Sequence, residues 1–131
     1  MTTPLDVATT YFEALESGDF ATVAAQLAED VVWHQPGGNR FSGVHRGSDA
    51  AGAMIGGMMA VSEGTFALRR NAPLMVNGDI VAAPVRWTAK RPGAEMDGVG
   101  VDLMRVADGK VAEVWLFTAD PAEEDAFWGQ G

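Results

Sequence analysis

Three turn sequences in the second half of the chain constrain its fold more than any other feature. The Asn77–Asp79 segment reads Asn-Gly-Asp, and an Asn-Gly pair between two strand-like runs is typical of a tight β-hairpin. Ala107–Gly109 predicts a second hairpin, and Arg91–Gly93 predicts a turn between the two. The strand-like runs separated by these turns cover residues 66–76, 80–90, 95–106 and 110–118. The second half therefore predicts a meander of antiparallel strands.

The start of the chain has the signals of two consecutive helices. Thr3 and Pro4 suit the N-cap and first position of a helix that ends near Ser17. Asp19 can cap a second, shorter helix that ends near Glu29. Because the connection is short, we expect the two helices to form an antiparallel hairpin.

A short strand and a third helix follow. Residues 31–35 are rich in β-branched and aromatic side chains, which predicts a strand that leads into a loop. Ser48 or Asp49 can then cap a helix that runs to Val61. Helices followed by hairpins are typical of α+β proteins, so we expect three N-terminal helices packed on an antiparallel sheet in a single domain, residues 1–131.

The acidic composition argues against several classes of partner. Eighteen acidic and nine basic residues give a net charge of −9 without a concentrated basic patch, which disfavours nucleic-acid binding. Without cysteine, the chain can form neither disulfides nor thiolate metal sites. The first residues do not have the pattern of a secretory leader, and no apolar run has the length of a membrane span. We expect a cytoplasmic protein that binds neither nucleic acid nor membranes.

Three segments are more specific than the order of the elements: YFEALESGD at 11–19, AEDVVWHQPGG at 28–38 and VDLMRVADGKVAEVW at 101–115. They resemble the SnoaL-like and ketosteroid isomerase-like proteins of the nuclear transport factor 2-like superfamily. The resemblance implies a curved, cone-shaped sheet that encloses an apolar pocket, and it implies a homodimer. The superfamily includes isomerases, cyclases, dehydratases, epoxide hydrolases and non-catalytic binding or dimerisation modules, so the fold alone does not choose an activity.

The resemblance implies roles for Tyr11 and Asp102. Related isomerases have a hydrogen-bonding tyrosine at the position of Tyr11 and a protonated aspartic acid at the position of Asp102. Both groups donate a hydrogen bond to a substrate oxygen in those enzymes. Strand alternation also groups Asp102 with small and apolar neighbours, which disfavours its charge. Two alternatives stay open: Asp102 can face solvent, or it can pair with Arg86 and remain ionised as a base or water-orienting group. Tyr11 can also be a helix-packing aromatic residue.

The proton acceptor of the isomerases is absent from its expected position. The related proteins carry an aspartate before the proline of the first strand, where this chain has Gln35, and an amide cannot take up a proton at neutral pH. His34 titrates in the useful range and is our candidate acceptor, although strand alternation points it away from Gln35. We expect Gln35 and Arg86 to position substrate or water.

The remaining candidate residues are apolar. Related cyclases often carry a histidine at position 102 and an acidic residue at 116, where this chain has Asp102 and Leu116, so a direct cyclase assignment is weakened. The expected apolar walls of the pocket are Trp33, Met54, Met58, Trp87 and Leu116, each of which could instead be ordinary core. The acidic tail, with the sequence EEDAFW, is expected to be a solvated cap with aromatic anchors rather than a catalytic carboxylate group.

No cofactor or metal is expected. The two histidines are too few for a metal site, and the glycine clusters lack the spacing of a phosphate-binding loop. The leading hypothesis is a cofactor-independent enzyme that acts on a small hydrophobic ketone or epoxide, of polyketide, terpenoid or steroid type. Tyr11, His34 and Asp102 would be its catalytic residues, in an isomerase, cyclase or epoxide hydrolase. The alternatives are a non-catalytic small-molecule-binding protein and a dimerisation module.

Overall fold

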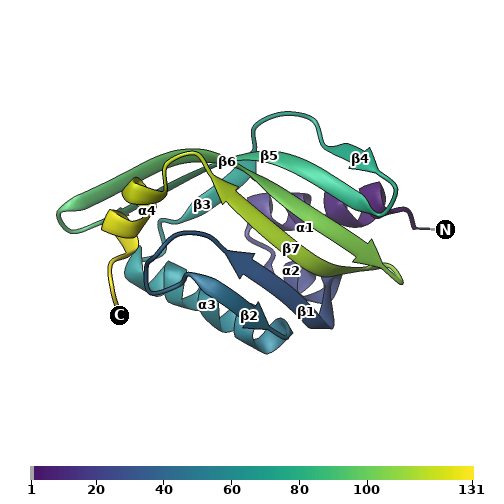
Figure 1. The fold of residues 1–131 in the computed structure, drawn as a ribbon, viewed down its shortest axis with the longest axis horizontal. Coiled ribbons are helices and arrows are strands. Elements are labelled where there is room, and N and C mark those ends of the chain that lie inside the picture. The colour runs from purple at the N-terminus through teal and green to yellow at the C-terminus, as the bar shows by residue number, and fades with distance from the viewer. Residues whose placement is uncertain (1) are drawn as a thin grey trace.

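Four helices and seven strands make up the region that the computed structural model describes, residues 2–131 (Figure 1). The helices are α1 (Pro4–Ser17), α2 (Phe20–Gln26), α3 (Ser48–Val61) and α4 (Pro121–Trp128). The strands are β1 (Leu27–Gln35), β2 (Gly43–Arg46), β3 (Ala67–Arg70), β4 (Met75–Asn77), β5 (Ile80–Arg91), β6 (Ala94–Ala107) and β7 (Lys110–Thr118). The predicted α+β class is confirmed, with α4 as a further helix after the last strand.

Side-chain caps explain where α1 and α2 begin. The Thr3 hydroxyl accepts a hydrogen bond from the Asp6 N–H at 3.1 Å, and the Asp6 carboxylate accepts one from the Thr3 N–H at 3.0 Å. Gly18 ends α1 in the left-handed region at φ 76°, and Asp19 caps α2. The second helix ends earlier than predicted, because Leu27 already has extended backbone and begins β1.

Two predictions for the middle of the chain are wrong. The N-cap of α3 is Gly47, at φ 94°, and neither Ser48 nor Asp49 provides a capping side chain. Strand β2 lies in the predicted loop, where it pairs with β1. Its four residues are mostly exposed and lack the alternation of apolar and polar residues that identifies longer strands.

The strands form one curved sheet in the order β2-β1-β7-β6-β5-β3, and β4 also pairs with β5. The predicted meander of β5, β6 and β7 is confirmed. However, β1 and β7 run parallel, with Trp33 opposite Val114, so the whole sheet is mixed. This parallel pair brings the first strand of the chain beside the last.

A proline explains why the first strand-like run forms two strands. Pro84 of β5 has no N–H to donate to a neighbouring strand. Strand β3 pairs with β5 as far as Arg70 opposite Val85, and β4 resumes the pairing at Met75 opposite Ala82. Pro84 therefore lies opposite the interruption, where its missing N–H breaks no regular ladder.

The helices cover one face of the sheet and close one of its ends (Figure 1). Helix α1 contacts β3, β5 and β6, helix α3 contacts β1 and β2, and α4 contacts β6. None of the helices formed by residues 2–131 has the length and apolar character needed to cross a membrane.

Candidate functional site

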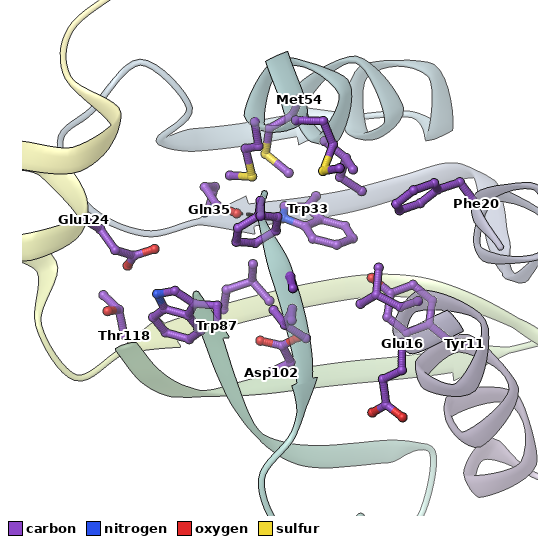
Figure 2. A pocket seen from close by; sticks show the side chains of 18 of the residues that line it. Tyr11, Glu16, Phe20, Trp33, Gln35, Met54, Trp87, Asp102, Thr118 and Glu124 are labelled. Atoms are coloured by element: carbon purple, nitrogen blue, oxygen red, sulfur yellow. Dashed lines mark hydrogen bonds between the residues drawn. The ribbon is translucent and has the colours of Figure 1, made fainter. Parts of the chain in front are cut away.

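A cavity of about 390 Å³ lies between the helices and the sheet (Figure 2). The five residues predicted as apolar walls all line it: Trp33, Met54, Met58, Trp87 and Leu116. Phe20, which also lines the cavity, is 45% exposed, so the cavity opens beside the start of α2. The side chains around the cavity are therefore mostly apolar.

Tyr11 and Asp102 bring two polar groups into this cavity. Both line it, and their side chains are buried, at 2% and 4% exposure. Burial raises the pKa of Asp102 to about 8, and the nearby charge of Glu124 adds to this rise. Burial, followed by the charge of Asp102, raises the pKa of Tyr11 well above its ordinary value. At neutral pH, Tyr11 and most of the Asp102 population therefore carry a proton that they can donate.

Arg86 does not pair with Asp102. Its guanidinium donates two hydrogen bonds to Asp97, from Nε at 2.8 Å and from Nη2 at 2.5 Å. Arg86 is also absent from the residues that line the cavity, as far as residues 2–131 are concerned. The structure therefore corrects two expectations, because Arg86 neither holds Asp102 ionised nor contacts the cavity.

His34 and Gln35 lie on opposite faces of β1. Gln35 lines the cavity, and its Oε1 accepts a hydrogen bond from Trp33 Nε1 at 3.0 Å. His34 lies outside the cavity, with Nε2 2.7 Å from Glu113 Oε2 and its ring stacked on Trp115. The geometry therefore gives no support to His34 as a proton acceptor for a molecule in the cavity.

Glu124 of α4 is a cavity residue that the sequence analysis missed. It was expected on a solvated cap, but it is only 7% exposed and lines the cavity. Figure 2 shows its carboxyl group pointing inward from the side opposite Tyr11. The helical spacing of Glu124, Phe127 and Trp128, which are all buried, was the available signal, because i, i+3 and i+4 share a helix face.

Three features set the pKa of Glu124. Burial is the largest and raises its pKa, and the acidic neighbours Asp125, Glu123 and Asp120 raise it further. A hydrogen bond with the Thr118 side chain acts in the opposite direction. Glu124 therefore has a higher proton affinity than an ordinary glutamate.

Glu16 is a further carboxyl group at the border of the cavity, but it already has a partner. Arg70 donates to its two oxygens from Nε at 2.9 Å and Nη2 at 2.7 Å, and this pairing lowers the pKa of Glu16. No three His, Asp or Glu side chains among residues 2–131 are close enough together to ligate a metal ion. Among the described residues, the ionisable groups available to a molecule inside the cavity are therefore chiefly those of Tyr11, Asp102 and Glu124.

The sequence also matches known proteins along most of its length. A protein of unknown function with a cystatin-like fold from Xanthomonas campestris is 46% identical, with a TM-score of 0.93 over 98% of this chain and 99% of that one. Bal32a, from a soil-derived mobile gene cassette, is 27% identical, with a TM-score of 0.90 over 96% of each chain. The uncharacterized protein Rv0034 of Mycobacterium tuberculosis is 33% identical over 95% of both chains.

One protein-family match covers most of the chain and identifies the family to which it belongs. The SnoaL-like domain matches residues 8–114, from α1 into β7. Solved structures with the nuclear transport factor 2-like fold are similar over nearly the whole chain, which agrees with the architecture of the sheet and helices. The chain belongs to the SnoaL-like family and has the nuclear transport factor 2-like fold.

Proposed function

We propose that this protein is a cofactor-independent enzyme that activates the oxygen atom of a small hydrophobic ketone or epoxide. The observation that carries this proposal is that Asp102 and Tyr11 are both buried and line the same largely apolar cavity, where burial raises the pKa of Asp102 to about 8. We expect both groups to donate a hydrogen bond to one ligand oxygen. Donors held in a water-excluded site stabilise developing negative charge more strongly than donors in water.

The residues around Tyr11 and Asp102 favour acid catalysis over proton abstraction. Gln35 cannot accept a proton, and His34 lies outside the cavity. Asp102 can donate its proton when the ligand oxygen becomes more basic, and Tyr11 strengthens the same site. This chemistry fits an isomerase, a cyclase or an epoxide hydrolase, all of which act through charge on an oxygen atom.

Hydrogen exchange on 1-tetralone, a bicyclic aromatic ketone, tests the proposal. Donation to the carbonyl oxygen acidifies the adjacent C–H group, and a buffer base then removes the proton. In D₂O, we expect the wild-type protein to accelerate deuterium uptake at this carbon by about 100-fold. Tyr11→Phe and Asp102→Asn should each remove most of the acceleration, as measured by proton NMR.

The same experiment separates the enzyme from a non-catalytic binding protein. Binding of 1-tetralone by calorimetry, weakened by Tyr11→Phe but without any deuterium uptake, would support binding alone. Absence of both binding and uptake would overturn the proposal. The proposal also includes a small apolar ligand and a homodimeric state. Sedimentation equilibrium measures the oligomeric state.

A further inference from the structure

Three buried polar atoms lack hydrogen-bond partners within residues 2–131, and all three belong to residues that line the cavity. They are Trp87 Nε1, Trp128 Nε1 and Glu124 Oε2. Each of these residues is more than nine-tenths buried, at 6%, 1% and 7% exposure. Buried polar groups are nearly always paired, so three unpaired atoms around one cavity indicate that a bound molecule supplies their partners.

The three atoms come from two elements that meet at one end of the cavity. Trp87 belongs to β5, while Glu124 and Trp128 belong to α4. Figure 2 shows the Trp87 nitrogen on the side of its ring nearest to Thr118 and Glu124. Tyr11 and Phe20 lie on the opposite side of the view. The unpaired atoms therefore form a second polar site on the side of the cavity opposite Tyr11, and Figure 2 shows Asp102 between the two sides.

Contacts with neighbouring segments hold α4 in place. Asp125 Oδ1 accepts hydrogen bonds from the Gly38 N–H and the Asn39 side chain, both at 2.9 Å. Arg91 Nε donates to the Phe127 carbonyl oxygen at 2.7 Å. The second polar site is therefore attached to a fixed helix, which preorganises Glu124 and Trp128 for a ligand.

The chemistry of the unpaired atoms selects the group that they bind. Each indole N–H can only donate a hydrogen bond, and an ionised carboxylate can only accept one. A hydroxyl group matches both, because its oxygen accepts from an indole and its hydrogen points to Glu124. When Glu124 is ionised, a carbonyl group can satisfy the indoles but not the carboxylate, and an ammonium group can satisfy the carboxylate but not the indoles. A protonated Glu124 could donate to a carbonyl group, and burial raises its pKa, so the hydroxyl preference belongs to the ionised form.

We infer that Glu124, Trp87 and Trp128 form a hydroxyl-binding site, so that the ligand is a compact, largely apolar hydroxy-ketone or hydroxy-epoxide with its two oxygens at opposite ends. This inference rests on the proposed function for the end that Tyr11 and Asp102 bind. The SnoaL-like match ends at residue 114, before α4 begins. The second site is therefore built partly from a region that the family match does not cover.

Three bicyclic ketones that differ at one position test the hydroxyl site by calorimetry. 6-Hydroxy-1-tetralone has a hydroxyl group opposite its carbonyl, 6-methoxy-1-tetralone can accept but not donate there, and 1-tetralone has no group there. We expect wild-type protein to bind the hydroxyl compound about tenfold or more tightly than the other two. Equal affinity for the three compounds would overturn the inference.

Two variants assign that preference to the proposed residues. Glu124→Leu and Trp87→Phe should each reduce it to about threefold or less, because each removes one hydrogen-bonding group. Glu123→Leu and Trp115→Phe are the matched controls, since neither residue lines the cavity. Thermal unfolding of Glu124→Leu should occur at or above the wild-type temperature, because a buried carboxyl group with one unpaired oxygen is replaced by an apolar group.

The pattern of losses distinguishes this inference from the proposed function. Tyr11→Phe should weaken the binding of all three ketones by a similar factor, because each carries the carbonyl group. A uniform loss in Tyr11→Phe without any hydroxyl preference in wild type would overturn the hydroxyl site alone. A hydroxyl preference that depends on Glu124, with no effect of Tyr11→Phe, would support the hydroxyl site and contradict the proposed oxygen-binding pair.

Discussion

The Nε1 atom of Trp87 lies only 2.6 Å from the position that a Cβ atom would take at Gly98. A Cβ atom at Gly100 would also meet the indole, at 2.8 Å, and the Phe117 carbonyl oxygen at 2.0 Å. The two glycines of β6 therefore allow the indole ring to lie close against the neighbouring strand. This contact sets the direction of the N–H group at the second polar site.

Gly98→Ala should displace the Trp87 indole. Because the indole is buried and closely packed, we expect the free energy of unfolding to fall by about 1–3 kcal/mol. The nitrogen-15 and proton resonances of the Trp87 indole N–H should shift, as measured by heteronuclear NMR. Unchanged Trp87 resonances together with wild-type stability would contradict the importance of this contact.

Neighbouring glycines in α3 should respond differently to alanine. A Cβ atom at Gly56 meets nothing within 4 Å, so Gly56→Ala should stabilise the protein by about 0.5–1 kcal/mol through helix propensity. At Gly57 the Cβ atom would lie 2.8 Å from Phe41 Cε1, and Gly57→Ala should gain less or lose stability. Chemical denaturation measures both. Equal stabilisation by the two substitutions would show that the Phe41 side chain can move aside without lowering the free energy of unfolding.

Asp102→Asn should change how stability depends on pH. The folded-state pKa of Asp102 is about 8, above its ordinary value of 3.8, so the folded state binds more protons between these pH values. Its contribution therefore makes stability decrease as the pH rises through this window, by at most about 1.4 kcal/mol per pH unit. Asparagine does not titrate, so the variant should lose less stability between about pH 5 and about pH 8 in urea denaturation.

Asp97→Asn is the control for this measurement. The hydrogen bonds from Arg86 lower the pKa of Asp97 below its ordinary value, so Asp97 is ionised in both the folded and unfolded states above about pH 5. Its stability difference from wild type should therefore stay constant over the window. Parallel curves for wild type and Asp102→Asn would contradict a raised pKa for Asp102.

His34→Gln should leave the cavity unaffected. The contact between His34 and Glu113 is partly exposed, at 33% and 24% for the two side chains, so its loss should cost about 1 kcal/mol or less. Affinity for 1-tetralone and deuterium uptake should remain at the wild-type level, because His34 does not line the cavity. A large loss of uptake with unchanged binding would restore His34 as a proton acceptor.

Local signals in the sequence predicted the elements that depend on neighbouring residues. The caps at Thr3 and Asp19 identified two helices, and the turns at Asn77–Asp79 and Ala107–Gly109 identified the long hairpins. The parallel pairing of β1 with β7 was missed, because it joins segments that are far apart in the chain. Strand β2 was missed because its pairing, rather than its own composition, makes it a strand.

The sequence likewise predicted part of the candidate site and missed the rest. Alternation along β6 correctly grouped Asp102 with the residues that face inward, and the expected apolar walls line the cavity. Alternation could not choose the partner of Arg86, since that depended on Asp97 lying one strand away within reach of its guanidinium. Glu124 was missed because acidic tails are usually solvated, whereas here Phe127 and Trp128 anchor the same helix face in the core.

Helix α4 adds side chains to a cavity whose other walls come from different elements. The curved sheet, α1 and α3 provide the apolar walls together with Tyr11 and Asp102, while the last helix contributes Glu124 and Trp128. If the second polar site binds a ligand, a substitution at Glu124 would alter which molecules are accepted without disturbing any strand pairing. Phe127 and Trp128 on the same helix face belong to the core, so new ligand preferences would arise at less risk to the fold at Glu124 than at these two positions.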